Sequence, residues 1–308
     1  MIELRRLFRF FGSTRAVNDV SFTVSPGQVF GFIGPNGAGK TTTMRILSTL
    51  DLPSHGDAFV DGFSVINDPD RVRLRLGFMP DFFGTYANVD CLEYLDFFAR
   101  SYGLAGTARR RALSRTLSFT GLDELAEKSV RALSKGMKQR LCLGRAMIHD
   151  PAALILDEPA SGLDPRARIE LRRMIRELAS EGKAILVSSH ILSELAEMCD
   201  QIGIIERGRI LAIGSVDEVL QGQAAQRTIR IRVLEGAGSL VRWLTGREAL
   251  SDVVADGAMI TFGHQGDRHD EAELLRDLIQ AGFAVSEFSS QKKSLEDVFM
   301  HVTTGAVQ

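Results

Sequence analysis

The sequence predicts an α/β fold in two parts: a larger domain built around a mainly parallel sheet, and a small C-terminal α+β domain. A glycine-rich turn at residues 34–39 joins an apolar strand to a helix, which is typical of phosphate-binding α/β domains. Strands and helices then alternate to about residue 213, as expected when crossover helices join parallel strands. Residues 228–289 follow the order β-α-β-β-α-β, which predicts a ferredoxin-like domain.

Composition places the chain among globular proteins and gives no sign of a nucleic-acid partner. The 308 residues suffice for one large domain and one small one, and they are 44% hydrophobic and 25% charged. With a net charge of -2 and a pI of about 6.3, no basic field favours nucleic acid. The three cysteines are far apart, as expected for reduced core thiols in a cytosolic protein.

The sequence does not predict a membrane span or a signal peptide. Residues 1–6 mix charged and apolar side chains, and no apolar run approaches the 18 residues that a spanning helix needs. We therefore expect any membrane role to come through a partner protein.

The larger domain is expected to hold antiparallel strands at its start and a helical insertion at about 89–130. The first two strands are expected at 2–11 and 17–24, and apolar residues recur at helical spacing within the insertion. Apolar runs of buried-strand length predict the other strands, at 28–33, 58–60, 76–79, 152–156, 184–187, 201–205 and 209–213. Amphipathic segments predict helices at 41–50, 69–75, 135–147, 166–180 and 191–198.

The predicted domain boundaries are 1–220 for the larger domain, 221–227 for a polar linker and 228–308 for the small domain. Within the small domain, helices are expected at about 238–246 and 270–281, between the strands of the β-α-β-β-α-β order. A last amphipathic helix is expected after Ser294, which suits an N-cap.

The glycine-rich turn matches the pattern G-x-x-x-x-G-K-[ST] of a phosphate-binding P-loop, so the larger domain is predicted to be a P-loop NTPase. Glycines let the backbone aim several N–H groups at a phosphate, and the helix N-terminus adds partial positive charge. Lys40 would reach the β- and γ-phosphates, and the Thr41 hydroxyl would bind Mg²⁺. The predicted nucleotide-binding residues of this loop are Gly34, Asn36, Gly37, Ala38, Gly39, Lys40, Thr41 and Thr42.

Two acids follow the apolar strand at 153–156. A P-loop ATPase needs a carboxylate linked to Mg²⁺ and a group that activates water. Asp157 fits the first role and Glu158 the second, as general base. An acidic turn after a strand is common in any protein, so Asp157 and Glu158 indicate catalysis only because the same chain has a P-loop.

Three further motifs complete a pattern. Residues 133–140 read LSKGMKQR at the start of a helix, residues 161–164 read SGLD after Glu158, and His190 ends the next strand. With the P-loop and the strand before Asp157, the chain from residue 1 to about 220 resembles the nucleotide-binding subunit of ABC transporters. The motifs stand in that family's order, as signature helix, D-loop and switch histidine.

The resemblance implies a head-to-tail dimer with ATP between two such subunits, most simply two copies of this chain. Ser134 and Gly136 of one subunit would then face the P-loop of the other, through the N-terminus of the signature helix. Asp164 would link the two sites and His190 would contact the γ-phosphate region. Phe11 stands where the family places the aromatic residue that stacks on adenine.

Two departures from the family pattern stand out. The family's Leu-Ser-Gly-Gly-Gln has Lys135 and Met137 in place of the first glycine and the glutamine, while Ser134 and Gly136 remain. After the strand at 76–79, where the family usually has a glutamine, the chain has Asp81. A carboxylate can bind Mg²⁺ directly, but when ionised it cannot donate a hydrogen bond.

The function expected from this resemblance is that of a Mg²⁺-dependent ATP-hydrolysing subunit. It would drive a separate membrane permease, as an exporter subunit, from the cytoplasmic face of the inner or plasma membrane. Residues 228–308 resemble the small C-terminal domain of some bacterial exporter subunits, including the ending SLEDVF at 294–299.

Two alternatives stay open. The first is a soluble ABC-type ATPase acting on nucleic acid or ribosomes; the single P-loop and the acidic pI do not favour it. The second is a regulatory subunit that has lost hydrolysis, which Asp81 and Lys135 would suit.

Overall fold

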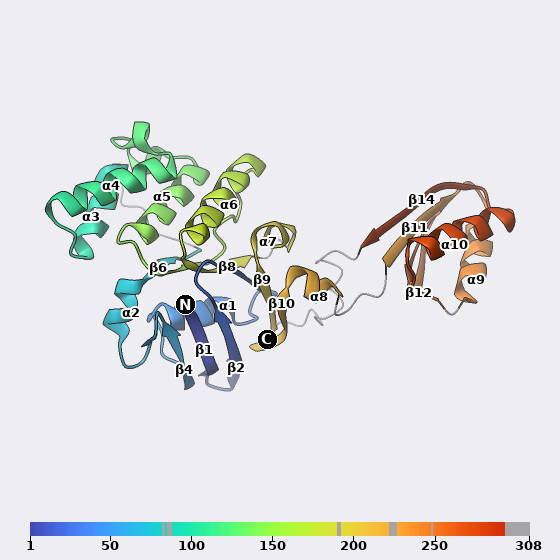
Figure 1. Ribbon diagram of the computed structural model, residues 1–308, viewed down its shortest axis with the longest axis horizontal. Coiled ribbons are helices and arrows are strands. Elements are labelled where there is room, and N and C mark those ends of the chain that lie inside the picture. The colour runs from blue at the N-terminus through green and yellow to red at the C-terminus, as the bar shows by residue number, and fades with distance from the viewer. Residues whose placement is uncertain (82–83, 85–87, 190–191, 222–226, 248, 293–308) are drawn as a thin grey trace. The chain divides into compact units, whose positions relative to one another are not determined.

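The computed structural model describes residues 1–81, 84, 88–189, 192–221, 227–247 and 249–292. The chain forms two compact units, one running from Met1 to Val216 and another beginning at Asp217. Each unit has its own hydrophobic core, and both are drawn in Figure 1.

A six-stranded sheet forms the centre of the first unit. Its strands run in the order β10-β9-β3-β8-β7-β6. All neighbours are parallel except β9 and β10, which form an antiparallel hairpin. The strands β3, β7 and β8 are buried along their whole length, as expected for parallel strands covered on both faces. The bounds are β3 Val29–Ile33, β6 Leu76–Met79, β7 Ala153–Leu156, β8 Ala184–Ser189, β9 Gln201–Glu206 and β10 Arg209–Ser215.

A second, antiparallel sheet is formed by the N-terminal strands in the order β2-β1-β4-β5. These strands are β1 Ile2–Phe11, β2 Thr14–Val24, β4 His55–Val60 and β5 Phe63–Ser64. The helix α1 (Lys40–Leu47) packs on it through β2 and β4. One core joins the two sheets, and in it the Phe22 ring of β2 stacks on Phe30 of β3, with ring centroids 4.7 Å apart.

Helices α5 (Lys135–Met147) and α6 (Pro165–Ser180) lie on the other side of the six-stranded sheet from α1 (Figure 1). α6 contacts β3 and β8 through a buried stripe that includes Leu171, Ile175 and Leu178. Two shorter helices of the first unit are α2 (Pro69–Arg75) and α7 (Leu192–Met198).

The predicted helical insertion is confirmed. Helices α3 (Cys91–Ser101) and α4 (Gly106–Thr120) pack against each other and against α5. They enclose a core of their own, with Tyr94, Leu95 and Leu141 among its buried members. A capping box at Asp90 fixes the start of α3. The Asp90 side chain accepts a hydrogen bond from the Glu93 amide, and the Glu93 side chain accepts one from the Asp90 amide.

The second unit has the predicted ferredoxin-like fold. Its sheet runs in the order β12-β13-β11-β14 with every neighbouring pair antiparallel. The two helices of this unit, α9 and α10, bury their apolar sides against strand residues such as Ile229, Ile231 and Phe262. The elements are β11 Arg227–Val233, α9 Ala237–Thr245, β12 Leu250–Asp256, β13 Met259–His264, α10 Arg268–Gln280 and β14 Val285–Lys292.

Differences from the predicted elements are few. A short helix, α8 (Val216–Gln221), was not anticipated, and it reaches the first residue of the predicted linker. Residues 222–226 of that linker and the predicted last helix after Ser294 lie outside the described residues. Among the described helices, none has both the length and the apolar character needed to cross a membrane.

Candidate functional site

The predicted site residues gather at one edge of the six-stranded sheet. Because β3, β6, β7 and β8 run parallel, the segments that follow them all leave from the same edge. Register pairs Ile33 with Ser189 and Leu156 with Met79, so the P-loop, the Asp157-Glu158 turn and Asp81 all start at this edge. Asp81 is exposed there, and His190, which directly follows β8, lies outside the described residues.

The P-loop backbone takes conformations that require glycine. Gly37 and Gly39 have positive φ angles of 78° and 106°. A Cβ atom at Gly39 would lie 2.3 Å from the Ala16 carbonyl oxygen, and one at Gly34 would lie 2.3 Å from that of Ile205. Asn36 and Gly37 at the tip are exposed. The loop is therefore held tightly at its two ends and presents its tip to solvent.

Lys40, the first residue of α1, lies inside this loop and is 6% exposed. Its Nζ donates hydrogen bonds to the carbonyl oxygens of Gly34 (2.5 Å) and Pro35 (3.2 Å). Burial lowers the pKa of the Lys40 amine, and the charges of Glu158 and then Asp157 partly oppose that change. The lysine and the two carboxylates therefore share one electrostatic environment. Thr41, next in α1, is exposed, and the first turn of that helix has no acidic residue.

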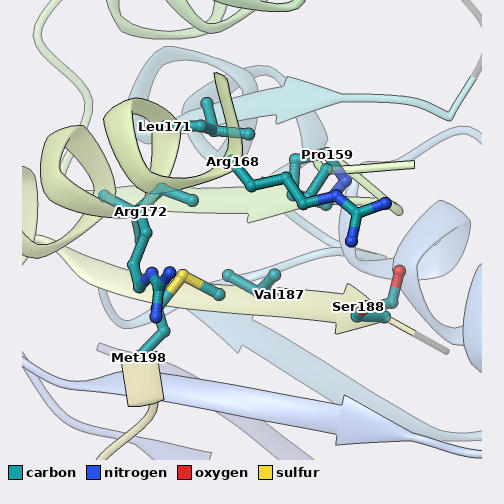
Figure 2. A pocket seen from close by; sticks show the side chains of 10 residues that line it. Pro159, Arg168, Leu171, Arg172, Val187, Ser188 and Met198 are labelled. Carbon is teal, nitrogen blue, oxygen red and sulfur yellow. The ribbon is translucent and has the colours of Figure 1, made fainter. Parts of the chain in front are cut away.

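Asp157 and Glu158 are joined through a serine of the neighbouring strand. Asp157 is 2% exposed, and its Oδ1 accepts a 2.6 Å hydrogen bond from the Ser188 hydroxyl. The same hydroxyl oxygen accepts a 2.9 Å hydrogen bond from the Glu158 amide. Glu158 has a positive φ of 50°, an uncommon value for a residue with a side chain. Figure 2 shows Ser188 beside Val187 at the end of β8, in the wall of a pocket between β8 and α6.

Ser188 was not among the predicted site residues. In the sequence it lies between the predicted strand at 184–187 and His190. The available signal was a pair of serines at the end of an apolar run, where a buried hydroxyl needs a hydrogen-bond partner.

The predicted signature and D-loop residues lie together at the starts of two helices. Ser134 is the N-cap of α5, and its hydroxyl accepts from the Met137 amide at 3.2 Å. Asp164 is the N-cap of α6, and its carboxylate accepts from the Ala167 amide at 2.9 Å. A Cβ atom at Gly136 would lie 3.1 Å from that of Ala167, so the two helix starts are in close contact.

Phe11 lies at the end of β1, in the β1–β2 hairpin whose Ala16 abuts the P-loop. Its ring is 48% exposed, and the Arg9 guanidinium lies 4.4 Å from the ring centroid. Asp51 holds Arg9 through an ion pair of 2.8 Å. An arginine therefore stacks on Phe11 while much of the side chain stays accessible, which suits stacking with a planar base.

The carboxylate and hydroxyl oxygens at this edge match the ligands that Mg²⁺ prefers. Asp157 is buried, yet no basic side chain of the described residues forms an ion pair with it. Among those residues, no cluster of three or more histidine, cysteine or acidic side chains could hold a metal by itself.

Comparison with protein families gives two matches. Residues 17–161 match the family model "ABC transporter", and residues 214–303 match the model "ATP-binding protein DrrA1-3-like, C-terminal domain".

Curated relatives align over nearly the whole chain. The uncharacterized ABC transporter ATP-binding protein YxlF of Bacillus subtilis is 34% identical over 98% of this chain and 99% of its own length. The Nod factor export ATP-binding protein I of Ralstonia nicotianae is 37% identical over 98% of this chain and 94% of its own.

Solved structures share the fold of the first unit. An ATP-binding subunit of an ABC transporter superposes with a TM-score of 0.66 at 31% identity, covering 72% of this chain and 92% of its own. A dimeric bacterial ABC transporter cassette, at 24% identity, superposes with a TM-score of 0.63 over 70% of this chain and 99% of its own.

Proposed function

Because this chain belongs to the ABC transporter ATP-binding proteins, which are ATPases, we propose that it binds and hydrolyses ATP with Mg²⁺ between two subunits and so drives a membrane permease. One observation carries the proposal. The P-loop, Lys40, Asp157 and Glu158 share a sheet edge, and the charges of both acids act on the lysine.

In this proposal the P-loop residues 34–42 hold the phosphates of ATP. The tip of the loop is exposed, and α1 directs its N-terminus and no acidic side chain toward the anion. The Lys40 amine exchanges its bonds with the Gly34 and Pro35 carbonyls for phosphate oxygens. Phe11, already stacked by Arg9, offers its ring to the adenine.

The residues present fit Mg²⁺. The Thr41 hydroxyl and the Asp157 carboxylate would hold it, and Asp81 adds a third oxygen ligand at the same edge. When bound, Mg²⁺ neutralises charge that develops on the phosphates. Asp157 suits this role because one of its oxygens is fixed by Ser188 and its charge is not neutralised by an ion pair with a described residue.

Glu158 is the proposed general base. It directly follows Asp157 at the end of β7, with its backbone amide bonded to Ser188. A carboxylate beside the γ-phosphate would accept a proton from the attacking water and orient it for in-line attack. His190 would contact the γ-phosphate from the end of β8.

The second half of each site is proposed to come from a second copy. The starts of α5 and α6 are in contact and present Ser134, Gly136 and Asp164 together. The N-terminus of α5 would face the γ-phosphate held by the partner's P-loop, while Asp164 would link the two sites. One structure with the same fold is a dimeric cassette.

The work of this ATPase is proposed to be export. The relative from Ralstonia nicotianae is an export ATP-binding protein by name, and it aligns over 98% of this chain. A separate permease would hold the subunit at the cytoplasmic face of the membrane. Co-purification of the full chain from its native membranes would identify that permease, and its recovery with ribosomes instead would contradict the proposal.

Glu158→Gln tests the catalytic assignment. We expect the variant to bind ATP and dimerise but to lose at least about 100-fold in turnover, because an amide cannot take the proton from water. ATPase rate and ATP-dependent dimerisation would be measured on the full-length chain. Glu177→Gln, at an exposed position of α6, is the matched control and should keep full activity. Turnover by Glu158→Gln equal to that of the control would remove Glu158 from the role of base.

A further inference from the structure

The Ser188 hydroxyl bonds to both Asp157 and Glu158. It is fully buried in β8, and its oxygen makes both hydrogen bonds at once. A hydroxyl has a single proton. Because that proton is given to Asp157 Oδ1, the oxygen must act as acceptor toward the Glu158 amide. The two bonds therefore fix each other's direction.

The bond to Asp157 fixes how this carboxylate is turned. At 2.6 Å, it has the length expected for a hydroxyl bonded to an ionised oxygen. This bond uses one of the two lone pairs of Oδ1, so both oxygens can still accept a cation, in an orientation that Ser188 sets. A serine at this place therefore selects which face of the carboxylate is presented at the sheet edge.

The bond to Glu158 holds an unfavourable backbone. A non-glycine residue with a φ of 50° is disfavoured by the contact of its Cβ with the backbone, and it stays there only when its surroundings hold it. The Glu158 amide donates its hydrogen bond to the Ser188 hydroxyl of the neighbouring strand. This bond determines where the Glu158 side chain starts.

We propose that Ser188 is a positioning residue for ATP hydrolysis, which orients the metal-binding carboxylate of Asp157 and the base Glu158 relative to each other. The inference rests on the proposed function, since it assumes the roles given there to the two acids. Ser188 does not touch the nucleotide; it acts through its two neighbours. Because the neighbouring strands β7 and β8 pair in register through Leu156 and Val187, no rearrangement of the sheet is needed for this contact.

The chain offers matched variants for a test. Ser188→Ala removes the hydroxyl, and Ser188→Thr keeps it and adds a methyl group beside the pocket of Figure 2, where about 20 Å³ is free. Ser290→Ala is the control, because the Ser290 hydroxyl makes a bond of equal length, 2.6 Å, to the buried Glu271 in the second unit. Each variant would be made in the full-length chain, and nucleotide-binding stoichiometry would count the intact sites.

Steady-state kinetics should separate positioning from folding. We expect Ser188→Ala to lower kcat about 10- to 100-fold, with the KM for ATP changed less than threefold and binding stoichiometry kept. Ser188→Thr should recover at least half of the wild-type kcat, and Ser290→Ala should leave it unchanged. In a Glu158→Gln background, Ser188→Ala should cost much less than it does alone, because the base it positions is already gone.

Failure of this inference can be told from failure of the proposed function. If Glu158→Gln turns over like wild type, the proposed roles are wrong and the inference falls with them. If Glu158→Gln is inactive but Ser188→Ala keeps its kcat, only the inference is overturned. Equal losses in the alanine and threonine variants, or in Ser290→Ala, would also overturn it, since the loss would not then follow the hydroxyl.

Discussion

Two buried carboxylates, one in each unit, each accept a hydrogen bond from a serine hydroxyl, but their charged neighbours differ. Asp157, in the first unit, accepts from Ser188 at 2.6 Å and is 2% exposed. Glu271, in the second unit, accepts from Ser290 at 2.6 Å and is 7% exposed. By exposure and hydrogen bonding alone, the two sites would be hard to tell apart.

The two carboxylates differ in whether a basic side chain forms an ion pair with them. Arg227 forms an ion pair with Glu271 and donates a 2.9 Å hydrogen bond to the Ser290 hydroxyl, so three side chains satisfy one another inside the second unit. For Asp157, the described residues supply no such ion pair. Lys40 is close enough for the two charges to act on each other, but its amine is bonded to P-loop carbonyls.

This contrast separates a carboxylate that serves the fold from one that serves a ligand. Burying a charge is costly unless a partner compensates it. Glu271 has its partner within the chain. Asp157 lies at the edge where the P-loop would hold an anion, and an external cation can supply the compensation.

Removing the Glu271 charge should give the largest effect on stability. Glu271→Gln leaves the partly buried Arg227 guanidinium without its buried acid, and breaking a buried pair typically costs about 3–5 kcal/mol. Chemical denaturation of the full-length chain, followed through the single tryptophan, Trp243 of the second unit, would measure it.

Glu287→Gln is the control for this change. It breaks the ion pair of Glu287 with Arg232, whose side chains are about half exposed, so the expected loss is only about 0–1 kcal/mol. Equal losses in the two variants would mean that burial does not distinguish the pairs, and the contrast with Asp157 would lose its basis.

The same change at Asp157 should act on catalysis and leave stability alone. Asp157→Asn removes a buried charge that has no internal ion pair, so the free energy of unfolding should not fall. Turnover at saturating Mg²⁺ and ATP should drop about 100-fold, or ~2.7 kcal/mol in barrier height. Denaturation and ATPase assays on one preparation would check both. A loss of stability as large as that of Glu271→Gln would show that Asp157 has a structural role instead.

The fold could be predicted from the sequence to a large extent because its signals are local. Helix α2 begins at Pro69 and strand β6 ends just before Pro80, as these two prolines predict. The order of the C-terminal elements followed from apolar periodicity alone. Helix α8 was missed because its six residues are too few to show a helical period; only Gln221 fell in the predicted linker.

Site residues could be predicted from the sequence only where they belong to a short motif. The motif predicted the P-loop, and the structure shows Lys40 within it. Neither the hydroxyl bridge at Ser188 nor the arginine stacked on Phe11 could be found this way. Each depends on which residues face each other across strands or along a hairpin, and no short sequence pattern encodes that.

A partly buried histidine, His149, extends the comparison, because burial acts on its charge more strongly than the neighbouring acid Asp150 does. His149 follows α5, its Nε2 lies 3.2 Å from the Leu76 carbonyl oxygen, and the Tyr102 ring stacks on it at 3.6 Å. Burial lowers the pKa of His149 to about 4, and the charge of Lys183 contributes to the shift. The fold therefore keeps this group neutral.

The lowered pKa of His149 has a consequence for stability in acid. The pKa of His149 is about 4 in the folded protein and about 6.5 in the unfolded chain, so between these values only the unfolded chain takes up the proton. Stability from this group is complete above pH 6.5 and is lost as the pH falls toward 4, by about 2 kcal/mol allowing for partial solvent access. His149→Gln keeps a donor for the Leu76 carbonyl and cannot titrate. Denaturation midpoints of both proteins from pH 7.5 to 4.5 should therefore converge as the pH falls. Parallel curves would mean that the folded and unfolded chains protonate His149 over the same pH range, so that burial does not lower its pKa.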